Sequence, residues 1–166
     1  MVFFSGGRGG GKQVDYGYKG KGVTSHLLVE REGRPLAITV TSAKGDERGQ
    51  VDPLLKKIKP LIQKVWNQGK VPVVEADKGY DAERVRKDVL KNKAFPLIAR
   101  RKNSKVEKGI CYIEKIRWKV ERTISWLKTK YRRISTRWER EVKYWNGFLQ
   151  FALIGYWLKF LVQSIF

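Results

Sequence analysis

Residues 23–41, VTSHLLVEREGRPLAITVT, decide the fold because they contain two β-type runs joined by a turn. Val, Leu, Ile and Thr are frequent in residues 23–30 and 36–41, a composition typical of strands. Residues 31–35 have turn composition, and Pro35 lacks the backbone donor that a continuing strand would need. The stretch therefore predicts a β-hairpin.

The segments that follow the hairpin alternate between helix and strand patterns. Apolar residues at three- and four-residue spacing from Val51 to Val65 predict an amphipathic helix that is interrupted or bent at Pro60. Residues 71–76 predict a short buried strand. Residues 81–93 predict a helix with Asp81 as its N-cap, and residues 95–99 a further strand.

The second half of the chain is predicted to be helical. Residues 100–111 form a basic linker. After it, apolar residues at helical spacing define the stripe of a long helix whose polar face is cationic. The stripe consists of Ile113, Ile116, Val120, Ile124, Leu127 and Tyr131.

Two stretches at the start of the chain complete the order of elements. Residues 1–4 predict a first strand. Residues 5–12 carry too many glycines for regular structure, and Gln13 follows Lys12 where a phosphate-binding P-loop needs Ser or Thr, so we expect a flexible basic turn. Together the elements predict the α/β class, with a mixed sheet flanked by helices in a single domain of residues 1–166.

The charge of the chain points to a polyanionic partner. Thirty-six Lys and Arg against 16 Asp and Glu give a net charge of +20. Because the basic residues are spread along the chain and alternate with Trp and Tyr, nucleic acid fits better than a membrane surface. The one cysteine, Cys111, cannot form an internal disulfide and is distant in sequence from His26, so we expect a reducing cytoplasm and no thiol catalysis.

Residues 144–166 are nearly continuously apolar and approach the length of a membrane span. Gln150, Lys159 and Gln163 fall inside the stretch and would be costly in lipid. A buried or interface helix is therefore the preferred interpretation over a membrane-associated protein.

Two carboxylates stand where α/β proteins place reactive groups. Asp77 directly follows the run at 71–76, at the carboxyl end of the predicted strand. Glu121 lies on the long helix, where its spacing of four residues from Arg117 and seven from Lys128 puts the three side chains on one face, beside the apolar stripe.

Both positions also have plainer interpretations. Arg117 and Glu121 have the i, i+4 spacing of an ordinary surface ion pair. Residues 77–80 have the composition of a strand-to-helix turn in which Gly79 supplies a positive φ and Asp77 bonds the backbone.

The segment Asp77-Lys78-Gly79-Tyr80-Asp81, followed by Arg117-x3-Glu121-x6-Lys128, resembles the signature of DDE-type transposases of prokaryotic insertion sequences. That branch carries a Tyr-x2-Arg-x3-Glu-x6-Lys motif. The likeness continues in residues 17–22, 33–37, 45–48 and 148–158, so it covers essentially the whole chain.

This resemblance implies a ribonuclease H-like fold, whose element order agrees with the one predicted above. It implies metal-dependent DNA cleavage and strand transfer in DNA transposition, with transposon ends and target DNA as partners. Asp77 and Glu121 would be catalytic and would bind Mg²⁺ or Mn²⁺, while Arg117 and Lys128 would contact DNA near the cleaved bond. Such transposases generally act as dimers, which the apolar C-terminal helix permits.

Further basic residues are expected to bind DNA phosphates, which would make the affinity fall steeply with salt. Their alternative role is that of a solvated surface. They are Arg100, Arg101 and Lys102 in the linker, extended by Lys105 and Lys108, and Arg132 and Arg133 after the long helix, extended by Arg137 and Arg140.

Two positions depart from the family pattern. Glu114 occupies the place of the motif's tyrosine, three residues before Arg117. Met1 occupies the place of the first catalytic Asp when residues 4–7, Phe-Ser-Gly-Gly, are aligned with the family's Phe-Ser-x-Gly segment. We therefore expect a catalytic domain that is truncated at its N-terminus and has no separate DNA-end-binding domain.

The missing carboxylate bears on activity, because a two-metal site normally needs three acids. We expect weak binding of one divalent ion and little or no strand transfer by this chain alone. Asp15 is the acid nearest in sequence to the vacant position, whereas Asp46 and Glu75 are poorly placed. The alternative function is that of a non-enzymatic nucleic-acid-binding remnant of a transposase.

Overall fold

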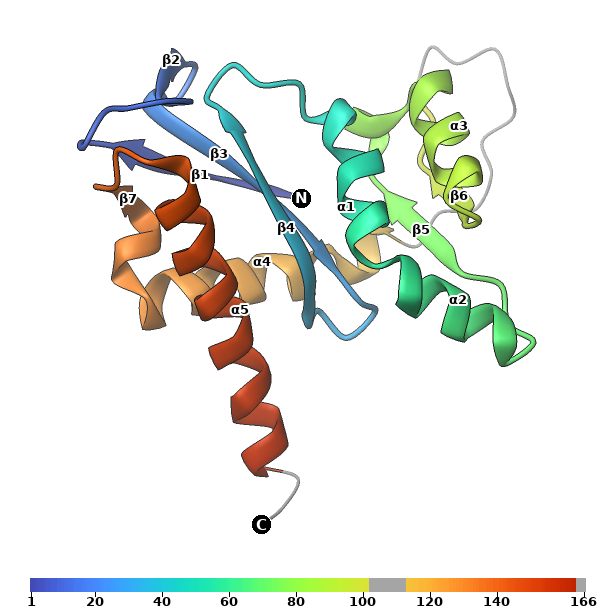
Figure 1. Ribbon diagram of the computed structural model, residues 1–166. Helices are drawn as coiled ribbons and strands as arrows, with labels where there is room; N and C mark the ends of the chain where they lie inside the picture. The colour runs from blue at the N-terminus through green and yellow to red at the C-terminus, as the bar shows by residue number, and fades with distance from the viewer. Residues whose placement is uncertain (102–112, 164–166) are drawn as a thin grey trace. The chain divides into compact units, whose positions relative to one another are not determined.

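The computed structural model describes residues 1–101 and 113–163, and the chain forms two compact units (Figure 1). The split unit is built from both ends of the chain, residues 1–46 and 119–166. The inserted unit, residues 47–118, lies between them in sequence. Both units combine helices with strands, which confirms the predicted α/β class.

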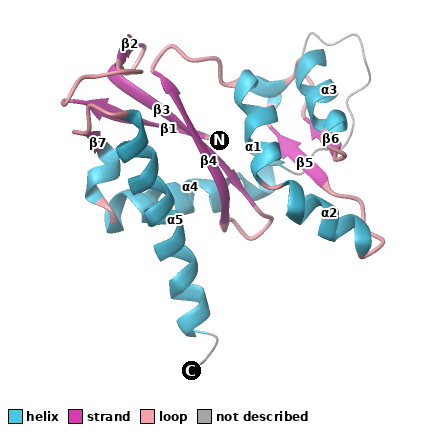
Figure 2. Ribbon diagram, viewed as in Figure 1, coloured by secondary structure: helices cyan, strands magenta, loops and turns pink. Residues whose placement is uncertain are grey.

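A five-stranded mixed sheet forms the framework of the split unit (Figure 2). The predicted hairpin is confirmed: β3 is antiparallel to β4 and its turn contains Gly33 with a φ of +90°. β3 is also antiparallel to β1 and β2, and β1 is parallel to β7. The strands are β1 (Val2–Gly7), β2 (Asp15–Gly17), β3 (Gly20–Val29), β4 (Pro35–Ser42) and β7 (Thr136–Arg137).

Two long helices, α4 (Ile113–Lys130) and α5 (Val142–Gln163), bury one face of this sheet, with η3 (Arg132–Ser135) between them. Phe3, Leu27 and Ile38 from the strands pack in one core with Leu127 and Trp145 from the helices. The predicted stripe of α4 is confirmed where its side chains are described, since Val120 and Leu127 are buried and Ile124 and Tyr131 pack against the core.

The inserted unit contains a separate sheet of two parallel strands, β5 (Val73–Ala76) and β6 (Phe95–Ile98). The prediction of a helix broken near Pro60 is confirmed, because α1 (Val51–Lys57) ends and α2 (Lys59–Asn67) begins just before that proline. A proline ring clashes with the carbonyl four residues earlier, which forces the break. The unit is completed by η1 (Arg48–Gln50), η2 (Lys78–Tyr80) and α3 (Glu83–Lys91).

The glycine-rich segment is more ordered than its composition predicts. Ser5, Gly6 and Gly7 continue β1, and residues 15–17 add β2 beside β3. The expectation that residues 5–12 hold no regular structure is therefore wrong for its first three positions. The reason is tertiary, because Gly6 pairs with Gly22 of β3 and with Thr136 of β7.

Two predictions for the inserted unit are corrected. The strand expected at 71–76 starts at Val73 and is not buried, since Val73 is 52% exposed. Asp81 is not the N-cap of the following helix, because α3 starts at Glu83 and Ala82 precedes it. The Asp81 carboxylate is instead engaged by side chains and backbone from elsewhere in the unit.

Helix α5 confirms the helix predicted from residue 144 onward. Among the described residues, no helix is both long and apolar enough to cross a lipid bilayer. One face of α5 lies in the core of the split unit, as the preferred interpretation of an apolar helix required.

Candidate active site

Asp77 stands at the carboxyl end of β5 and caps the short turn η2. Its Oδ1 accepts a hydrogen bond of 2.8 Å from the backbone N–H of Gly79. The interpretation of Asp77 as a residue that bonds the backbone is confirmed, whereas the positive φ expected at Gly79 is not found. The glycine matters there for another reason: a Cβ at position 79 would stand 2.8 Å from Asp77 Oδ1, so another residue would displace the Asp77 carboxylate.

Two arginines brace the turn that carries Asp77. Arg48 Nε donates to the carbonyl of Gly79 at 2.8 Å, and Arg101 Nε donates to the carbonyl of Lys78 at 3.2 Å. The backbone carbonyls of the two residues that follow Asp77 are thus held by side-chain hydrogen bonds. Arg48 was not singled out from its own chemistry, although the segment at 45–48 formed part of the family resemblance.

Asp81 joins this turn to the end of β6. Its side chain is 10% exposed and lies 2.8 Å from Arg86 Nη2 and 3.4 Å from Arg100 Nη1. Its Oδ2 also accepts the backbone N–H of Arg101 at 2.9 Å. Burial opposes ionisation of Asp81, but the hydrogen bonds from Arg101 and Arg86 outweigh it and lower its pKa.

Tyr80 is the aromatic member of the turn. Burial raises the pKa of its hydroxyl, and the negative charges of Glu47 and Asp77 act in the same direction. Both carboxylates therefore lie within electrostatic range of the Tyr80 ring, inside the inserted unit.

The other predicted acid, Glu121, lies on α4 in the split unit and is exposed. Arg117, one helical turn earlier, is also exposed. Lys128 is half-buried: its Nζ donates to the carbonyl of Phe4 at 3.3 Å and lies 5.4 Å from the centre of the Phe3 ring. Burial lowers the pKa of Lys128, and the charge of Lys19 lowers it further. This side chain is thereby fixed against β1.

The basic residues expected to bind DNA occupy different settings. Arg132 is exposed, and Arg133 pairs with Glu139 at 2.6 Å. Arg100 and Arg101 contact the Asp81 carboxylate, and Lys102 lies outside the described residues. A guanidinium has five N–H donors, so these contacts leave capacity for a phosphate.

Asp15, the acid nearest in sequence to position 1, does not lie near it in the structure. Asp15 pairs with Gly22, which also pairs with Gly6, whereas Val2 pairs with His26 at the other end of β1. The separation along the strand is about 13 Å, from roughly 3.3 Å per residue. The backbone N–H of Tyr16, and then Lys44 at 3.2 Å, lower the pKa of Asp15, so its carboxylate is already engaged.

Hard oxygen ligands such as those of Asp77 and Glu121 suit Mg²⁺ or Mn²⁺. Asp77 uses Oδ1 for the bond to Gly79, and its second oxygen can serve as a ligand. Within residues 1–101 and 113–163, no three His, Cys, Asp or Glu side chains are grouped so as to hold a metal ion.

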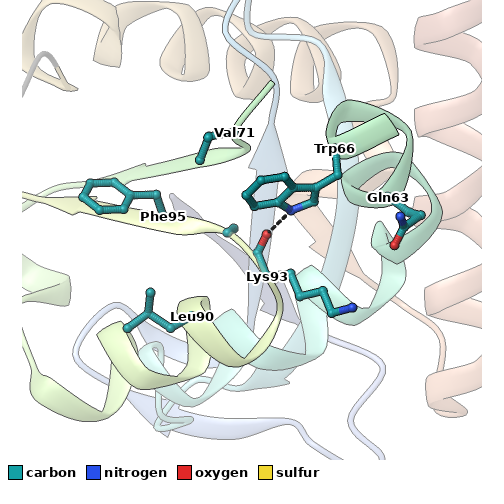
Figure 3. A pocket seen from close by; sticks show the side chains of 7 residues that line it. Gln63, Trp66, Val71, Leu90, Lys93 and Phe95 are labelled. Carbon is teal, nitrogen blue, oxygen red and sulfur yellow. Dashed lines mark hydrogen bonds between the residues drawn. The ribbon is translucent and has the colours of Figure 1, made fainter. Parts of the chain in front are cut away.

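A pocket of about 450 Å³ lies in the inserted unit (Figure 3). It is lined mainly by apolar side chains, including Trp66, Leu90 and Phe95, and the Trp66 indole N–H donates to the carbonyl of Lys93 at 2.7 Å. Val71 and Phe95 lie near the amino ends of β5 and β6, so this pocket is not part of the Asp77 turn.

Sequence comparisons identify the family. The model of the family described as "Transposase DDE domain" matches residues 4–154. A protein assigned as a transposase for insertion sequence element IS402 of Burkholderia cepacia is 35% identical over 130 residues, which make up 78% of this chain and 59% of that relative. The chain therefore spans little more than half of the relative's length, and no solved structure matches it significantly. The match over most of its residues shows that the chain belongs to the transposase DDE domain family.

Proposed function

We propose that this chain carries catalytic carboxylates of a metal-dependent DNA transposase and that Asp77 and Glu121 are two of them. The observation that carries the proposal is the Asp77 turn: a carboxylate at the end of a strand, held by Gly79 and braced by Arg48 and Arg101, in a chain of the DDE family. Such rigidity is what a metal ligand needs, because coordination tolerates little displacement.

The proposed domain is a single ribonuclease H-like catalytic domain interrupted by the inserted unit. The mixed sheet of the split unit and the helices on its face support this assignment. So does the family match, which runs across both units.

When bound, divalent ions would activate the attacking hydroxyl and stabilise the leaving oxygen of the phosphodiester. The residues of this chain supply ligands and positioning. Asp77 and Glu121 offer carboxylate oxygens, and Arg48 keeps the Asp77 turn in place. Arg117 and Lys128 are proposed to contact DNA near the cleaved bond, with Lys128 held beside β1 through its bond to Phe4.

DNA phosphates are the proposed partners of the other basic residues, on transposon ends and target alike. The net charge of +20 supports this proposal, because neutralising phosphates releases counterions and drives binding. The proposed contacts are Arg100, Arg101, Lys102, Arg132 and Arg133. We propose that the protein acts in the prokaryotic cytoplasm.

Position 1 is proposed to limit activity. Met1 stands where the resemblance assigns a carboxylate, directly before β1. A site with two acids has too little negative charge for two divalent ions. Cleavage by the chain is therefore expected to be weak until an aspartate is placed there.

Nicking of supercoiled DNA in the presence of Mn²⁺ tests these assignments. The proteins compared are the chain itself, a version with Asp in place of Met1 behind a new start residue, and Asp77→Asn and Glu121→Gln in that version. We expect nicking to rise with the added Asp and to fall by about 100-fold or more in either acid variant. Asp88→Asn, which removes the charge of a half-buried acid of α3 paired with Arg84, is the matched control and should nick normally.

The outcomes separate the two candidate functions. Nicking that survives Asp77→Asn would refute the assigned site. Salt-sensitive DNA binding without nicking in any version, and without an effect of Mg²⁺, would identify the chain as a non-enzymatic nucleic-acid-binding protein.

We also propose that the protein is a homodimer joined through α5. Its outer face carries an apolar seam, defined as Tyr144, Phe151, Ile154, Leu158 and Leu161, each more than half exposed. From Phe151 to Leu161 these residues recur at the three- and four-residue spacing of a coiled-coil heptad, and Tyr144 lies one heptad before Phe151. The seam is opposite the face of α5 that is buried in the core. If each seam residue buries about 100 Å² of accessible surface, two seams would bury about 1,000 Å² in total. This area reaches the lower limit of specific interfaces.

A further inference from the structure

The glycine-rich segment that the proposed function leaves unexplained packs against the loop that follows β7. Gly9 N–H donates to the carbonyl of Arg137 at 3.2 Å. A Cβ on Gly9 would overlap the carbonyl of Trp138, and one on Gly11 would overlap the carbonyl of Arg140. The glycines therefore allow a backbone approach that no other residue permits.

The loop on the other side of this contact is held by a buried arginine. Arg137 is 0% exposed, and its guanidinium donates to the carbonyls of Glu139 at 2.7 Å and Arg140 at 3.0 Å. Burial of this guanidinium in turn depends on the loop that surrounds it. The two segments thus form one fixed backbone surface at the end of the sheet where β2, β3, β1 and β7 lie in order (Figure 1).

Exposed aromatic rings lie at this end of the sheet, two on β2 and the turn after it and one directly after β7. Tyr18 is fully exposed, Tyr16 is 65% exposed and Trp138 is 55% exposed. Large rings are normally buried, and exposing several of them on a fixed backbone costs free energy unless a partner covers them. We define these three residues as the aromatic platform.

Cations accompany two of the three rings. The Arg8 guanidinium lies 5.9 Å from the centre of the Trp138 ring, and Lys21 Nζ lies 5.7 Å from the centre of the Tyr16 ring. Lys12, in the glycine-rich segment, and Lys19, in the turn between β2 and β3, add positive charge. This density of cations is untypical of a surface that binds another protein, because charged residues, and lysine in particular, are depleted at the core of protein interfaces.

We propose that the aromatic platform binds unpaired bases of DNA. Flat rings beside cations suit a ligand that has both flat bases and phosphates. Bases inside a duplex are stacked on one another and are not available to these rings, whereas unpaired bases are. From β2 to β7 the sheet has three strand-to-strand steps. At roughly 4.8 Å per step, the aromatic platform spans about 14 Å, which is enough for a few nucleotides.

This proposal rests on the proposed function only in taking DNA as the polyanion. A strand that has been cut can separate from its complement at the cut end, which would make unpaired nucleotides available beside the reacting bond. A platform for them would favour the opened form of the DNA over the paired form.

Fluorescence anisotropy without divalent metal tests the proposal. The probes are an oligothymidine of about 20 nucleotides and a duplex of the same length, each titrated at several salt concentrations. We expect Tyr18→Ala/Trp138→Ala to bind the oligothymidine at least tenfold more weakly, from about 1 kcal/mol or more for each lost stack. Duplex affinity should stay within about twofold, and the salt slope should not change, because no charge is removed.

Matched variants make the result specific. Tyr18→Phe/Trp138→Phe keeps the rings and should retain binding of the oligothymidine. Phe95→Ala removes an exposed ring of the inserted unit and should have no effect. Gly9→Ala, whose Cβ would meet Trp138, should reproduce the loss, whereas Gly6→Ala, whose Cβ would meet no atom within 4 Å, should not.

Equal loss for both DNA forms, or no loss for either, would overturn the proposal. Loss in Phe95→Ala as large as in the platform variant would also overturn it. The two proposals can fail separately. A chain that nicks DNA through Asp77 but does not need its platform rings for the oligothymidine refutes this inference alone, and a chain that needs the rings but does not nick in any version refutes the proposed function alone. A chain that binds neither DNA form refutes both.

Discussion

At the residue scale, the Asp77 turn depends on the absence of one side chain. The Gly79 N–H reaches Asp77 Oδ1 at 2.8 Å, and a Cβ at position 79 would stand equally close to that oxygen. We expect Gly79→Ala to push the carboxylate aside and to reduce Mn²⁺-dependent nicking at least tenfold, while DNA affinity at high metal concentration stays unchanged. Both are measured in the version with Asp at position 1.

The matched control for this variant is Gly147→Ala. Gly147 lies in α5, where an added methyl group would meet no atom within 4 Å. Replacing a helical glycine should leave nicking unchanged and raise the free energy of unfolding by about 0.5–1 kcal/mol. Normal nicking by Gly79→Ala would show that the turn does not set the position of Asp77.

His26 makes a prediction about pH. The side chain is 1% exposed and its Nε2 lies 2.7 Å from Thr41 Oγ1. Burial lowers its pKa to about 4, the charge of the N-terminal amine acts in the same direction, and Asp46 opposes both. In the unfolded chain the pKa is the usual value of about 6.5. As the pH falls below about 6.5, the unfolded state takes up the proton first, and stability is lost until about pH 4.

The size of this loss can be measured by urea unfolding at pH 7 and pH 4.5. A difference of roughly 2.5 pKa units corresponds to about 3 kcal/mol at most. His26→Gln lacks the titrating group. Between pH 7 and pH 4.5 its free energy of unfolding should therefore fall by about 2–3 kcal/mol less than that of the unsubstituted protein. Equal falls in the two proteins would contradict the prediction.

At the scale of elements, one hydroxyl joins the hairpin turn to α4. Thr123 is 0% exposed, and its Oγ1 donates to the carbonyl of Gly33 at 2.6 Å while also contacting the carbonyl of Lys119 at 3.0 Å. Thr123→Val keeps the shape but leaves the Gly33 carbonyl without this partner. We expect a loss of about 1–2 kcal/mol in the free energy of unfolding.

Thr129→Val is the control for that variant, since Thr129 lies on the same helix and is exposed. It should change stability by less than about 0.5 kcal/mol. Comparable losses in the two variants would show that valine weakens α4 through its helix propensity and not through the lost contact with the turn.

Elements with strong local patterns could be predicted from the sequence, and those made by distant partners could not. The hairpin and the stripe of α4 carry their own periodicity, so both were predictable. By contrast, β7 has two residues and exists because it pairs with Gly6 and Gly7. Asp81 has the composition of an N-cap, but Arg86 and the backbone of Arg101 compete for its carboxylate.

The same limit applies to the candidate site. Asp77 was predictable because it directly follows a strand, and the residues after it are local. Arg48 acts on the turn across 31 residues of sequence, so no spacing rule identifies it. The assignments of Asp77 and Glu121 as catalytic residues come from the family resemblance and stay predictions.

At the scale of the whole molecule, the α5 seam makes a prediction about assembly. Placing a charge in the seam leaves a buried, unpaired cation in any dimer formed through it. Light scattering after size exclusion should show a dimer for the chain and a monomer for Ile154→Lys. Asn146→Lys adds the same charge to an exposed α5 position outside the seam and should remain a dimer. A monomeric chain, or a dimeric Ile154→Lys, would refute the proposed interface.

The division of the split unit has a consequence for how the protein is made. Gly6 of β1 pairs with Thr136 of β7, so this pairing waits until the whole inserted unit has been synthesised. The inserted unit is continuous and can fold as it leaves the ribosome, which shortens the flexible loop that the later pairing must close. Until α4 and α5 arrive, the core face of the hairpin, with Leu27 and Ile38, has no cover. The nascent chain therefore passes through a stage at which this apolar surface is open to aggregation, because the helices that cover it are synthesised last.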